Sequence, residues 1–315
     1  MTPYTALNYP KSMKKPRIVA FINFKGGVGK TANVVNIGAC LAKYHRKKVL
    51  IIDIDAQCNA TFWVLKRKQL SQRLEDPSRT VYQVFHDHIA GTKLFDFENS
   101  VIRGVPVSDE GFPYIAQLDI LPSSIDLMSI EERFSGMQGK PYFAALHSGL
   151  KDCVKEYDYV LIDCPPNIYG ISKNALYFAD YYVVPYLPDF LSLSGFRLFS
   201  KLVQKFQYQV SGYQNKKFNP RICAVIINRY RSIGNVFDQS VNELKLEMRN
   251  LKTQKLIHQC SAILTPYIRD CVRVAECSNA HQPVIIYGEK SIGAYDYFKL
   301  SDAFINHIEE IIWAC

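Results

Sequence analysis

The residues best suited to chemistry form one short stretch, KGGVGKT, which runs from Lys25 to Thr31. Its glycines let backbone N–H groups approach phosphate oxygens, and a helix that begins there adds the partial positive charge of its N-terminus. The Lys30 ammonium can reach the β- and γ-phosphates of a nucleotide, and the Thr31 hydroxyl can bind Mg²⁺. The alternative is a turn whose lysines point into solvent. The strand expected before the loop and the helix expected after it disfavour that alternative.

Three aspartates are candidates for the same site. Asp53 and Asp55 follow the apolar run 48–52, and Asp163 ends the run 159–162. Each aspartate alone could cap a helix or occupy a turn. In a parallel sheet, however, the carboxyl ends of the strands share one edge, and ligands bind at that edge. Carboxylates placed there suit the Mg²⁺ that bridges two phosphates, so these residues and the glycine loop predict one site.

Strands and helices that would position these residues alternate along the chain. Apolar, β-branched runs predict buried strands, and runs with helical periodicity predict helices. The predicted strands cover residues 18–22, 48–53, 118–122, 159–163, 181–186 and 222–227. The predicted helices cover residues 32–42, 143–157, 172–178, 192–207 and 236–251, and a last helix begins near residue 294. This order predicts an α/β fold with three layers, in which helices cover both faces of a mostly parallel, twisted sheet.

The chain is long enough for one large domain. We expect this domain to cover residues 17–315, after a flexible basic tail over residues 1–16. The interval 62–117 is the least regular part and is expected to hold one or two helices and several loops. Two short apolar runs, 262–264 and 284–286, have no assigned role in the sequence pattern.

Composition narrows the class of protein. Apolar residues make up 48% of the 315 residues, yet no run of 18 apolar residues is present, so no transmembrane helix is expected. Nine scattered cysteines without a CxxC pair indicate reduced thiols in a cytoplasm. A net charge of +9 favours a polyanionic partner such as nucleic acid or an anionic membrane. An equally good interpretation is that the positive charge only improves solubility.

The glycine loop departs from the usual pattern, because Phe24 stands where the first glycine is normally found and Lys25 follows it. A loop with two lysines resembles the deviant P-loop, or deviant Walker A motif, of the ParA/MinD family of dimerising ATPases. Further segments resemble the motifs of this family in the same order: DIDAQCNAT (53–61), LDILPSSIDLMSIE (118–131), 157–189, NRY (228–230) and, more loosely, 268–287 and 291–300. The resemblance covers most of the chain and implies a P-loop NTPase fold.

The resemblance implies a role for each matching residue. Lys25 would cross a dimer interface to the partner's γ-phosphate and would act in catalysis together with Lys30 and Asp55. Asp55 would orient or activate the attacking water. Asn228 would contact adenine. The triphosphate would be held by Gly26, Gly27, Val28, Gly29, Lys30, Thr31 and Ala32. Magnesium would be held by Thr31 directly and by Asp53 and Asp163 through water. Ala56 replaces a proline of the family, which is expected to change loop stiffness rather than chemistry.

Two branches of the family differ in the surface they bind. The ParA-like branch binds DNA non-specifically as an ATP-bound dimer, and the MinD-like branch binds membranes through a basic, amphipathic C-terminal helix. Residues 300–315 of this chain contain Asp302, Glu309 and Glu310 but no lysine or arginine. An anionic membrane would repel this segment, so we expect it to pack on the core.

The resemblance therefore implies a cytoplasmic, nucleoid-associated ATPase of the ParA type. Its cofactors would be ATP and Mg²⁺, and its partners a second copy of the chain, non-specific DNA and a ParB-like or other cargo adaptor, without stable membrane association. Candidate DNA contacts are Arg269, Arg273 and Lys290, near the further basic residues Lys216, Lys217 and Lys299. The alternatives are a MinD-like membrane-associated positioning ATPase and, more remotely, an ATP-dependent metabolic ligase or an iron–sulfur reductase on the same fold.

Overall fold

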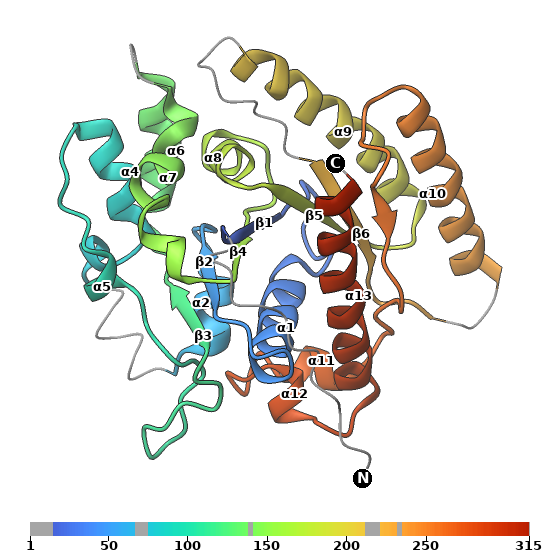
Figure 1. The fold of residues 1–315 in the computed structure, drawn as a ribbon, viewed down its shortest axis with the longest axis horizontal. Helices are drawn as coiled ribbons and strands as arrows, with labels where there is room; N and C mark the ends of the chain where they lie inside the picture. The colour runs from blue at the N-terminus through green and yellow to red at the C-terminus, as the bar shows by residue number, and fades with distance from the viewer. Residues whose placement is uncertain (1–14, 67–74, 138–140, 212–220, 232–234, 315) are drawn as a thin grey trace.

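The computed structural model describes residues 15–66, 75–137, 141–211, 221–231 and 235–314. Within them, seven parallel strands form a single sheet (Figure 1). In spatial order the strands are β3 (Leu118–Leu121), β2 (Val49–Asp53), β4 (Tyr159–Asp163), β1 (Arg17–Phe21), β5 (Tyr181–Tyr186), β6 (Arg221–Ile227) and β7 (Ala262–Ile263). The α/β, mostly parallel sheet that the sequence predicts is confirmed.

The strands are largely apolar, with Asp53 and Asp163 at the carboxyl ends of β2 and β4, because both faces of the sheet are covered. Successive side chains of a strand point to opposite faces. In β1, Val19 and Phe21 belong to one apolar cluster, whereas Ile18 and Ala20 belong to another. Each cluster therefore fills the space between one face of the sheet and the helices that cover it.

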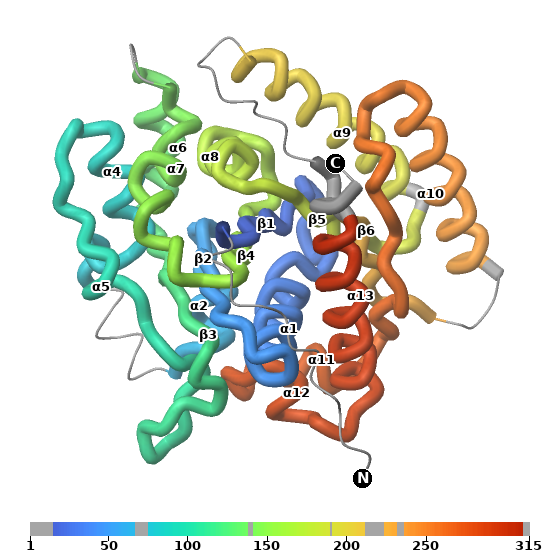
Figure 2. Tube along the Cα trace, in the orientation of Figure 1, coloured from blue at the N-terminus to red at the C-terminus, as the bar shows by residue number. Residues whose placement is uncertain are grey.

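One face of the sheet is covered by the first helix and by the C-terminal part of the chain. These helices are α1 (Lys30–Lys43), α2 (Asn59–Val64), α11 (Val272–Glu276), α12 (Val284–Tyr287) and α13 (Ile292–Ala314). Figure 2 shows α1 beside α13, although they lie at opposite ends of the chain. Phe304 of α13 stacks on Phe21 with ring centroids 6.2 Å apart. The expectation that the last helix packs on the core is confirmed.

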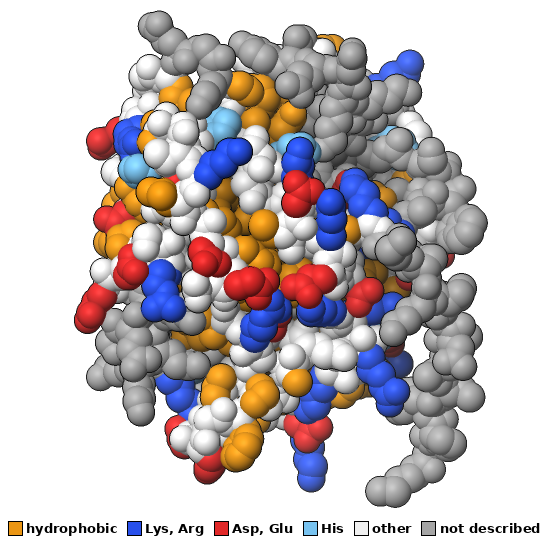
Figure 3. All heavy atoms as spheres, turned by 60° about the vertical axis from the view of Figure 1, so that its left-hand side comes forward, with side chains coloured by type: hydrophobic (Ala, Val, Ile, Leu, Met, Phe, Trp, Pro, Cys, Tyr) orange, Lys and Arg blue, Asp and Glu red, His pale blue; other side chains and the backbone are white. Residues whose placement is uncertain are grey.

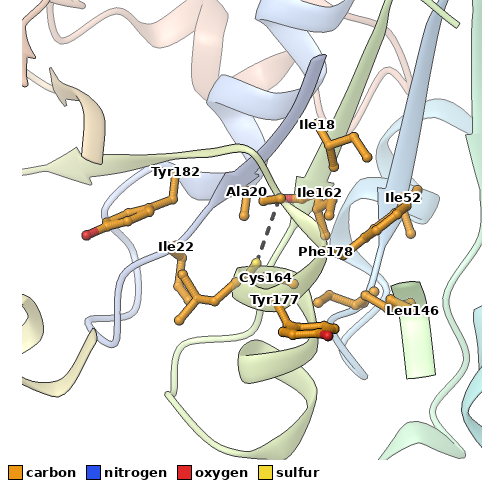
Figure 4. Close-up of a cluster of buried hydrophobic side chains, with 14 of the residues drawn as sticks. Ile18, Ala20, Ile22, Ile52, Leu146, Ile162, Cys164, Tyr177, Phe178 and Tyr182 are labelled. Atoms are coloured by element: carbon orange, nitrogen blue, oxygen red, sulfur yellow. Dashed lines mark hydrogen bonds between the residues drawn. The ribbon is translucent and has the colours of Figure 1, made fainter. Parts of the chain in front are cut away.

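The other face is covered by the middle of the chain. Its helices are α4 (Val81–Ala90), α6 (Leu127–Ser135), α7 (Ala145–Leu150), α8 (Gly170–Phe178), α9 (Phe190–Ser211) and α10 (Asn235–Thr253), with the short α5 (Phe97–Ser100) at the edge. Figure 4 shows part of this core, where Ile22, Cys164 and Tyr177 lie close together. Cys164 directly follows Asp163, so this core reaches up to the edge of the sheet where the aspartates lie.

The prediction of one continuous helix over residues 143–157 is wrong. The structure divides this interval into a 3-10 turn at Tyr142–Ala144, α7, and a second 3-10 turn at Cys153–Glu156. A Cβ at Gly149 would lie 2.7 Å from Val84, so α7 packs too closely on α4 for a larger residue there. Glycine inside a helix lowers helix propensity, which favours a short segment.

The two unassigned apolar runs have different structures. Ala262 and Ile263 form β7 at the edge of the sheet, whereas residues 284–287 form the single turn α12. Among the residues described, no helix is both long enough and apolar enough to cross a membrane. The tail over residues 1–16 lies almost entirely outside the described residues, and its flexibility and the single-domain assignment stay predictions.

Candidate nucleotide-binding site

The glycine loop connects β1 to α1 and is shaped by two glycines with positive φ. Gly27 has φ 72° and Gly29 has φ 91°, and a side chain in either conformation would be strained. Gly29 precedes the first residue of α1, and its carbonyl accepts the helix-forming bond from Asn33 N at 2.9 Å. The first N–H groups of α1 are therefore directed at the space above the loop, which suits an anion.

Lys30 is the buried cation of the loop. Its side chain is at the start of α1, its residue is 8% exposed, and its Nζ donates to the carbonyl of Lys25 at 3.1 Å. Burial lowers the pKa of the Lys30 ammonium, while the negative charge of Asp163 opposes this shift. A buried ammonium with one carbonyl acceptor can still donate to a phosphate.

Asp53 and Asp163 lie side by side because β2 and β4 pair in register at these residues. Asp163 accepts a hydrogen bond from Thr31 Oγ1 at 2.7 Å through Oδ2, while its buried Oδ1 has no hydrogen-bond partner. Burial raises the pKa of Asp53 to about 7, and burial followed by the charge of Asp53 raises the pKa of Asp163 well above its usual range. A divalent cation nearby would offset both penalties.

These groups fit magnesium better than a metal held by protein ligands alone. Within the described residues, no three His, Cys, Asp or Glu side chains gather as a metal cluster. Mg²⁺ usually keeps several waters and binds through one or two protein oxygens plus substrate phosphates. The Thr31 hydroxyl and the free Oδ1 of Asp163 are oxygens of this kind. The structure thus brings together Thr31, Asp53 and Asp163 as the sequence predicts.

Asp55 lies on the loop that follows β2 and is 6% exposed. Its Oδ1 accepts a hydrogen bond from Gln57 N at 3.0 Å. Its carbonyl accepts two more, from Cys58 N at 2.8 Å and from Ser123 Oγ at 2.7 Å. Cys58 takes a left-handed conformation with φ 55°, so the loop turns sharply before α2. The position of Asp55 is therefore set by hydrogen bonds from its own loop and from the side chain of Ser123.

A cleft of about 640 Å³ lies over the glycine loop and Asp55. Its walls include the loop glycines 26, 27 and 29 and the residues Lys30, Thr31, Ala32, Asp55, Gln57, Pro166, Ser278 and Asn279. A volume of this size is typical of small-molecule sites. The glycine loop and Asp55 thus meet at one cleft, and Asp163 adjoins it through its hydrogen bond with Thr31.

Lys25 points away from this cleft. Its Nζ donates to both carboxylate oxygens of Asp189, at 2.8 and 3.0 Å, and to Ser192 Oγ at 3.1 Å. The Lys25 side chain is 31% exposed, so this ion pair lies at the surface where β5 leads into α9. Its role across a dimer interface stays a prediction.

Asn228 follows β6 and lies directly beneath the glycine loop. Its Nδ2 donates to the carbonyls of Val28, at 3.0 Å, and Ile226, at 3.2 Å. A Cβ on Gly29 would come within 3.1 Å of the Asn228 side chain. In this structure Asn228 therefore supports the loop, and its contact with adenine stays a prediction.

Of the candidate DNA contacts, Arg269 lies just before α11, Arg273 lies in α11, and Lys290 lies just before α13. Arg269 forms a two-pronged ion pair with the fully buried Asp296, with Nε to Oδ2 at 2.9 Å and a second bond at 2.5 Å. Arg273 pairs with Glu276 at 2.9 Å, whereas Lys290 is exposed. Lys216 and Lys217 lie outside the described residues. DNA contact by any of these residues stays a prediction.

Sequence reasoning missed several residues that support the site. Thr61 donates to Asp53 Oδ2 from its backbone N at 2.8 Å and from its hydroxyl at 2.7 Å. Ser123 and Asp189 contact Asp55 and Lys25 as described above. All three lie inside motifs that resemble the family, at 53–61, 118–131 and 157–189. The motifs could have marked these three residues as candidates. Their partners could not be predicted, because most of them are distant in sequence.

Comparisons with known proteins agree with this geometry. A family model described as an AAA domain matches residues 16–219. Soj, a sporulation initiation inhibitor protein from Bacillus subtilis, is 29% identical over 285 residues, which cover 90% of this chain and 96% of Soj. The chromosome partitioning protein ParA from Myxococcus xanthus is 26% identical over 287 residues, covering 90% of this chain and 86% of that protein.

Solved structures show the same fold. An ATP complex of a McdA variant from Cyanothece superposes with a TM-score of 0.66 at 19% identity, covering 94% of this chain and 97% of McdA. Cobyrinic acid a,c-diamide synthase from Mycobacterium smegmatis, with bound ADP and magnesium, has a TM-score of 0.65 at 23% identity, covering 93% and 96%. At these identities the likeness concerns the fold.

A parallel sheet with a glycine loop, a buried lysine at a helix start and strand-end aspartates defines a P-loop NTPase. The family match extends over more than half of the residues. With its second lysine at position 25, the chain belongs to the ParA/MinD family of deviant P-loop ATPases.

Proposed function

We propose that this protein is a Mg²⁺- and ATP-dependent, dimerising ATPase of the ParA type. In its ATP-bound state it would bind DNA non-specifically and position a plasmid, a chromosome or another cargo. A ParB-like partner or another cargo adaptor would stimulate its hydrolysis, which is expected to be weak without that partner. The protein would act in the cytoplasm, on the nucleoid.

The observation that carries this proposal is the opposite placement of the two lysines of one loop. Lys30 lines the cleft, whereas Lys25 does not and is held at the surface by Asp189. Lys30 alone is placed to bind the phosphates of the chain's own nucleotide. If Lys25 exchanges its contact with Asp189 for a phosphate, it can reach a nucleotide bound by a second copy of the chain. An arginine finger acts in trans in the same way.

The residues of the cleft divide the work of phosphoryl transfer. The glycine loop and the N-terminus of α1 would hold the phosphates, and Lys30 would neutralise their charge. Thr31, Asp163 and Asp53 would hold Mg²⁺, which offsets charge on the β- and γ-phosphates when it is bound. Asp55 would orient the attacking water, since its carboxylate lies on the cleft wall.

DNA binding is supported by the net charge of +9 and by the relatedness to a chromosome partitioning protein. Figure 3 shows that the face over α4 to α7 carries acidic and basic side chains in small interspersed groups. The exposed Lys290, just before α13, is a better candidate for a phosphate contact than the mixed charges of the face over α4 to α7. A dimer would double any such contact, and binding would fall steeply with salt.

Membrane association is disfavoured by α13. Its apolar residues, among them Tyr297, Leu300, Phe304 and Ile308, are buried in the core rather than displayed. Tyr297 also donates from its hydroxyl to Asn33 of α1 at 3.0 Å. The described part of the helix would have to leave the core to enter a bilayer.

The experiment that tests the proposal is a DNA-binding titration by fluorescence anisotropy. A labelled duplex of arbitrary sequence is titrated in Mg·ATP, in Mg·ADP and without nucleotide, at two salt concentrations. We expect tight binding with Mg·ATP alone, lost at high salt and lost in Lys30→Ala. Equal binding in all nucleotide states, or its persistence in Lys30→Ala, would contradict the proposal. ATP-dependent sedimentation with anionic liposomes instead of DNA would favour the membrane alternative.

A further inference from the structure

A connection over residues 122–131 runs from the end of β3 through the first half of α6 and contacts both loops that flank the nucleotide cleft. One of these loops follows β2 and carries Asp55. The other follows β4, covers residues 164–169 and places Pro166 on the cleft wall. Ser123 and Glu131, near the two ends of the connection, do not line the cleft themselves. Their contacts reach it through the two loops.

Ser123 holds the Asp55 loop at two points. Its hydroxyl donates to the carbonyl of Asp55 at 2.7 Å, and its backbone N donates to Thr61 Oγ1 at 3.0 Å. Thr61 in turn donates to Asp53 Oδ2. Ser123 is fully buried, so no water can replace its hydroxyl without a rearrangement. Asp55, and the strand-end Asp53 through Thr61, are thus anchored to the segment that follows β3.

Glu131 holds the other loop. Its carboxylate accepts hydrogen bonds from Gly170 N at 2.9 Å and from Ile171 N at 2.8 Å. These are the first N–H groups of α8, and Tyr169, the residue before this helix, provides no side-chain cap. A carboxylate at a helix start gains from two charge-assisted bonds and from the helix dipole. Glu131 therefore fixes where the loop over residues 164–169 ends.

The part between these two contacts is held against the core by the inner face of α6. Leu127, Ile130 and Phe134 of α6 are buried in the core. A Cβ on Gly170 would lie 2.4 Å from Phe134, so α6 and α8 are in close contact there. Packed interiors transmit displacements rather than absorb them. A shift at one end of the connection is expected to reach the other.

We propose that Ser123 and Glu131 are positioning residues for ATP hydrolysis, which together set the distance between the Asp55 loop and the loop over residues 164–169. This inference rests on the proposed ATPase function. Asp55 would orient water correctly only while both contacts are in place. A displacement of about 1 Å at a reacting centre can cost on the order of a hundredfold in rate, so small shifts in the connection suffice.

The first test compares Ser123→Thr with Ser123→Val. Threonine and valine have the same shape, so the two variants differ in the hydroxyl and share any effect of the added methyl group. In steady-state assays we expect kcat of the valine variant to be about tenfold or more below that of the threonine variant, with similar KM and nucleotide affinity. Ser124→Ala is the matched control, because Ser124 is buried but bonds to Asp126 instead.

The second test uses Glu131→Ala, with the exposed neighbour Glu132→Ala as control. We expect kcat to fall about tenfold in Glu131→Ala and to be partly rescued in Glu131→Gln, which keeps one acceptor oxygen. If both residues act through one connection, the double variant of Ser123→Val and Glu131→Ala loses less than the product of the single losses. Fully multiplicative losses would overturn the shared mechanism.

The wild-type protein separates failure of this inference from failure of the proposed function. Absence of Mg·ATP hydrolysis in the wild type, with and without DNA, would remove the function itself. Normal wild-type turnover with equal kcat in the Ser123→Thr and Ser123→Val variants would overturn the positioning role alone. A kcat gap between these two variants at equal nucleotide affinity would support it.

Discussion

In the nucleotide cleft, charged side chains are buried without a complete set of partners, whereas around α11 and α13 two of the three candidate cations face acids of their own chain. Asp163 keeps a free, buried Oδ1, and Lys30 has one carbonyl acceptor. Arg269 and Arg273 instead pair with Asp296 and Glu276. Buried polar groups normally have partners, so the first pattern indicates that a ligand completes the site.

Net charge alone does not show which cations of a protein are available to a ligand. The net charge of +9 is shared among many side chains, some of which serve internal pairs. A cation that neutralises a buried acid contributes to stability first and offers less to a phosphate.

The largest effect is expected when the buried cation of the cleft is removed. Lys30→Ala should weaken ATP binding on the order of a hundredfold, because each ionic bond to a phosphate contributes roughly 1.5 kcal/mol or more. Isothermal titration calorimetry with Mg²⁺ and a non-hydrolysable analogue measures this. Lys290→Ala, which removes an exposed lysine, is the control and should bind normally. Equal ATP affinities for the two variants would show that Lys30 does not bind the phosphates.

The next effect concerns stability at the other region. Arg269→Ala leaves the fully buried Asp296 without its cation and should lower the free energy of unfolding by about 2 kcal/mol. The value is at the low end for such pairs because the Arg269 side chain is 41% exposed. Arg273→Ala removes a surface pair and should cost much less. Urea unfolding of both variants tests this, and similar losses would mean that the Arg269 pair is not structural.

The stability of the protein without metal and nucleotide should depend on pH through Asp53, beside the cleft. The pKa of Asp53 is raised by burial to about 7, from an ordinary value of 3.8. The folded state then binds more protons than the unfolded state near neutral pH, so stability rises as the pH falls through about 7. The expected gain is about 1 kcal/mol between pH 8 and pH 6.

Urea unfolding in EDTA at several pH values measures this gain. Asp53→Asn is the control, since it cannot titrate at this position and should show a smaller pH dependence. An identical dependence in wild type and variant would show that Asp53 is not the group responsible. The prediction therefore tests whether burial of this acid carries the free-energy cost that a cation would relieve.

The smallest effect is expected from a single DNA contact. Lys290→Ala should weaken DNA binding of the ATP-bound protein a few-fold and reduce the slope of log affinity against log salt by about one per chain. Fluorescence anisotropy at several salt concentrations measures both quantities. A slope equal to that of the wild type would remove Lys290 from the DNA-binding surface.

Much of the fold and of the nucleotide site could be predicted because the signals are local. A buried parallel strand reads as a continuous apolar run, and Lys25 to Thr31 form one uninterrupted loop. The strand-end aspartates Asp53 and Asp163 follow from the same runs. Their pairing in register then follows from the parallel sheet.

The remaining features depend on residues that meet only after folding. Lys25 meets Asp189 across 164 positions, and Asp55 meets Ser123 across 68. The Arg269 ion pair spans 27 positions. Neither periodicity nor composition records such contacts.

The central claim is that two copies of the chain meet across their bound nucleotides, with Lys25 of each reaching the other's ATP. Sedimentation velocity in Mg²⁺ with a non-hydrolysable ATP analogue tests it most directly. We expect the wild type to change from monomer to dimer when the analogue is added, and Lys25→Ala to bind the analogue yet remain monomeric. A dimer that forms equally well in Lys25→Ala would contradict the account.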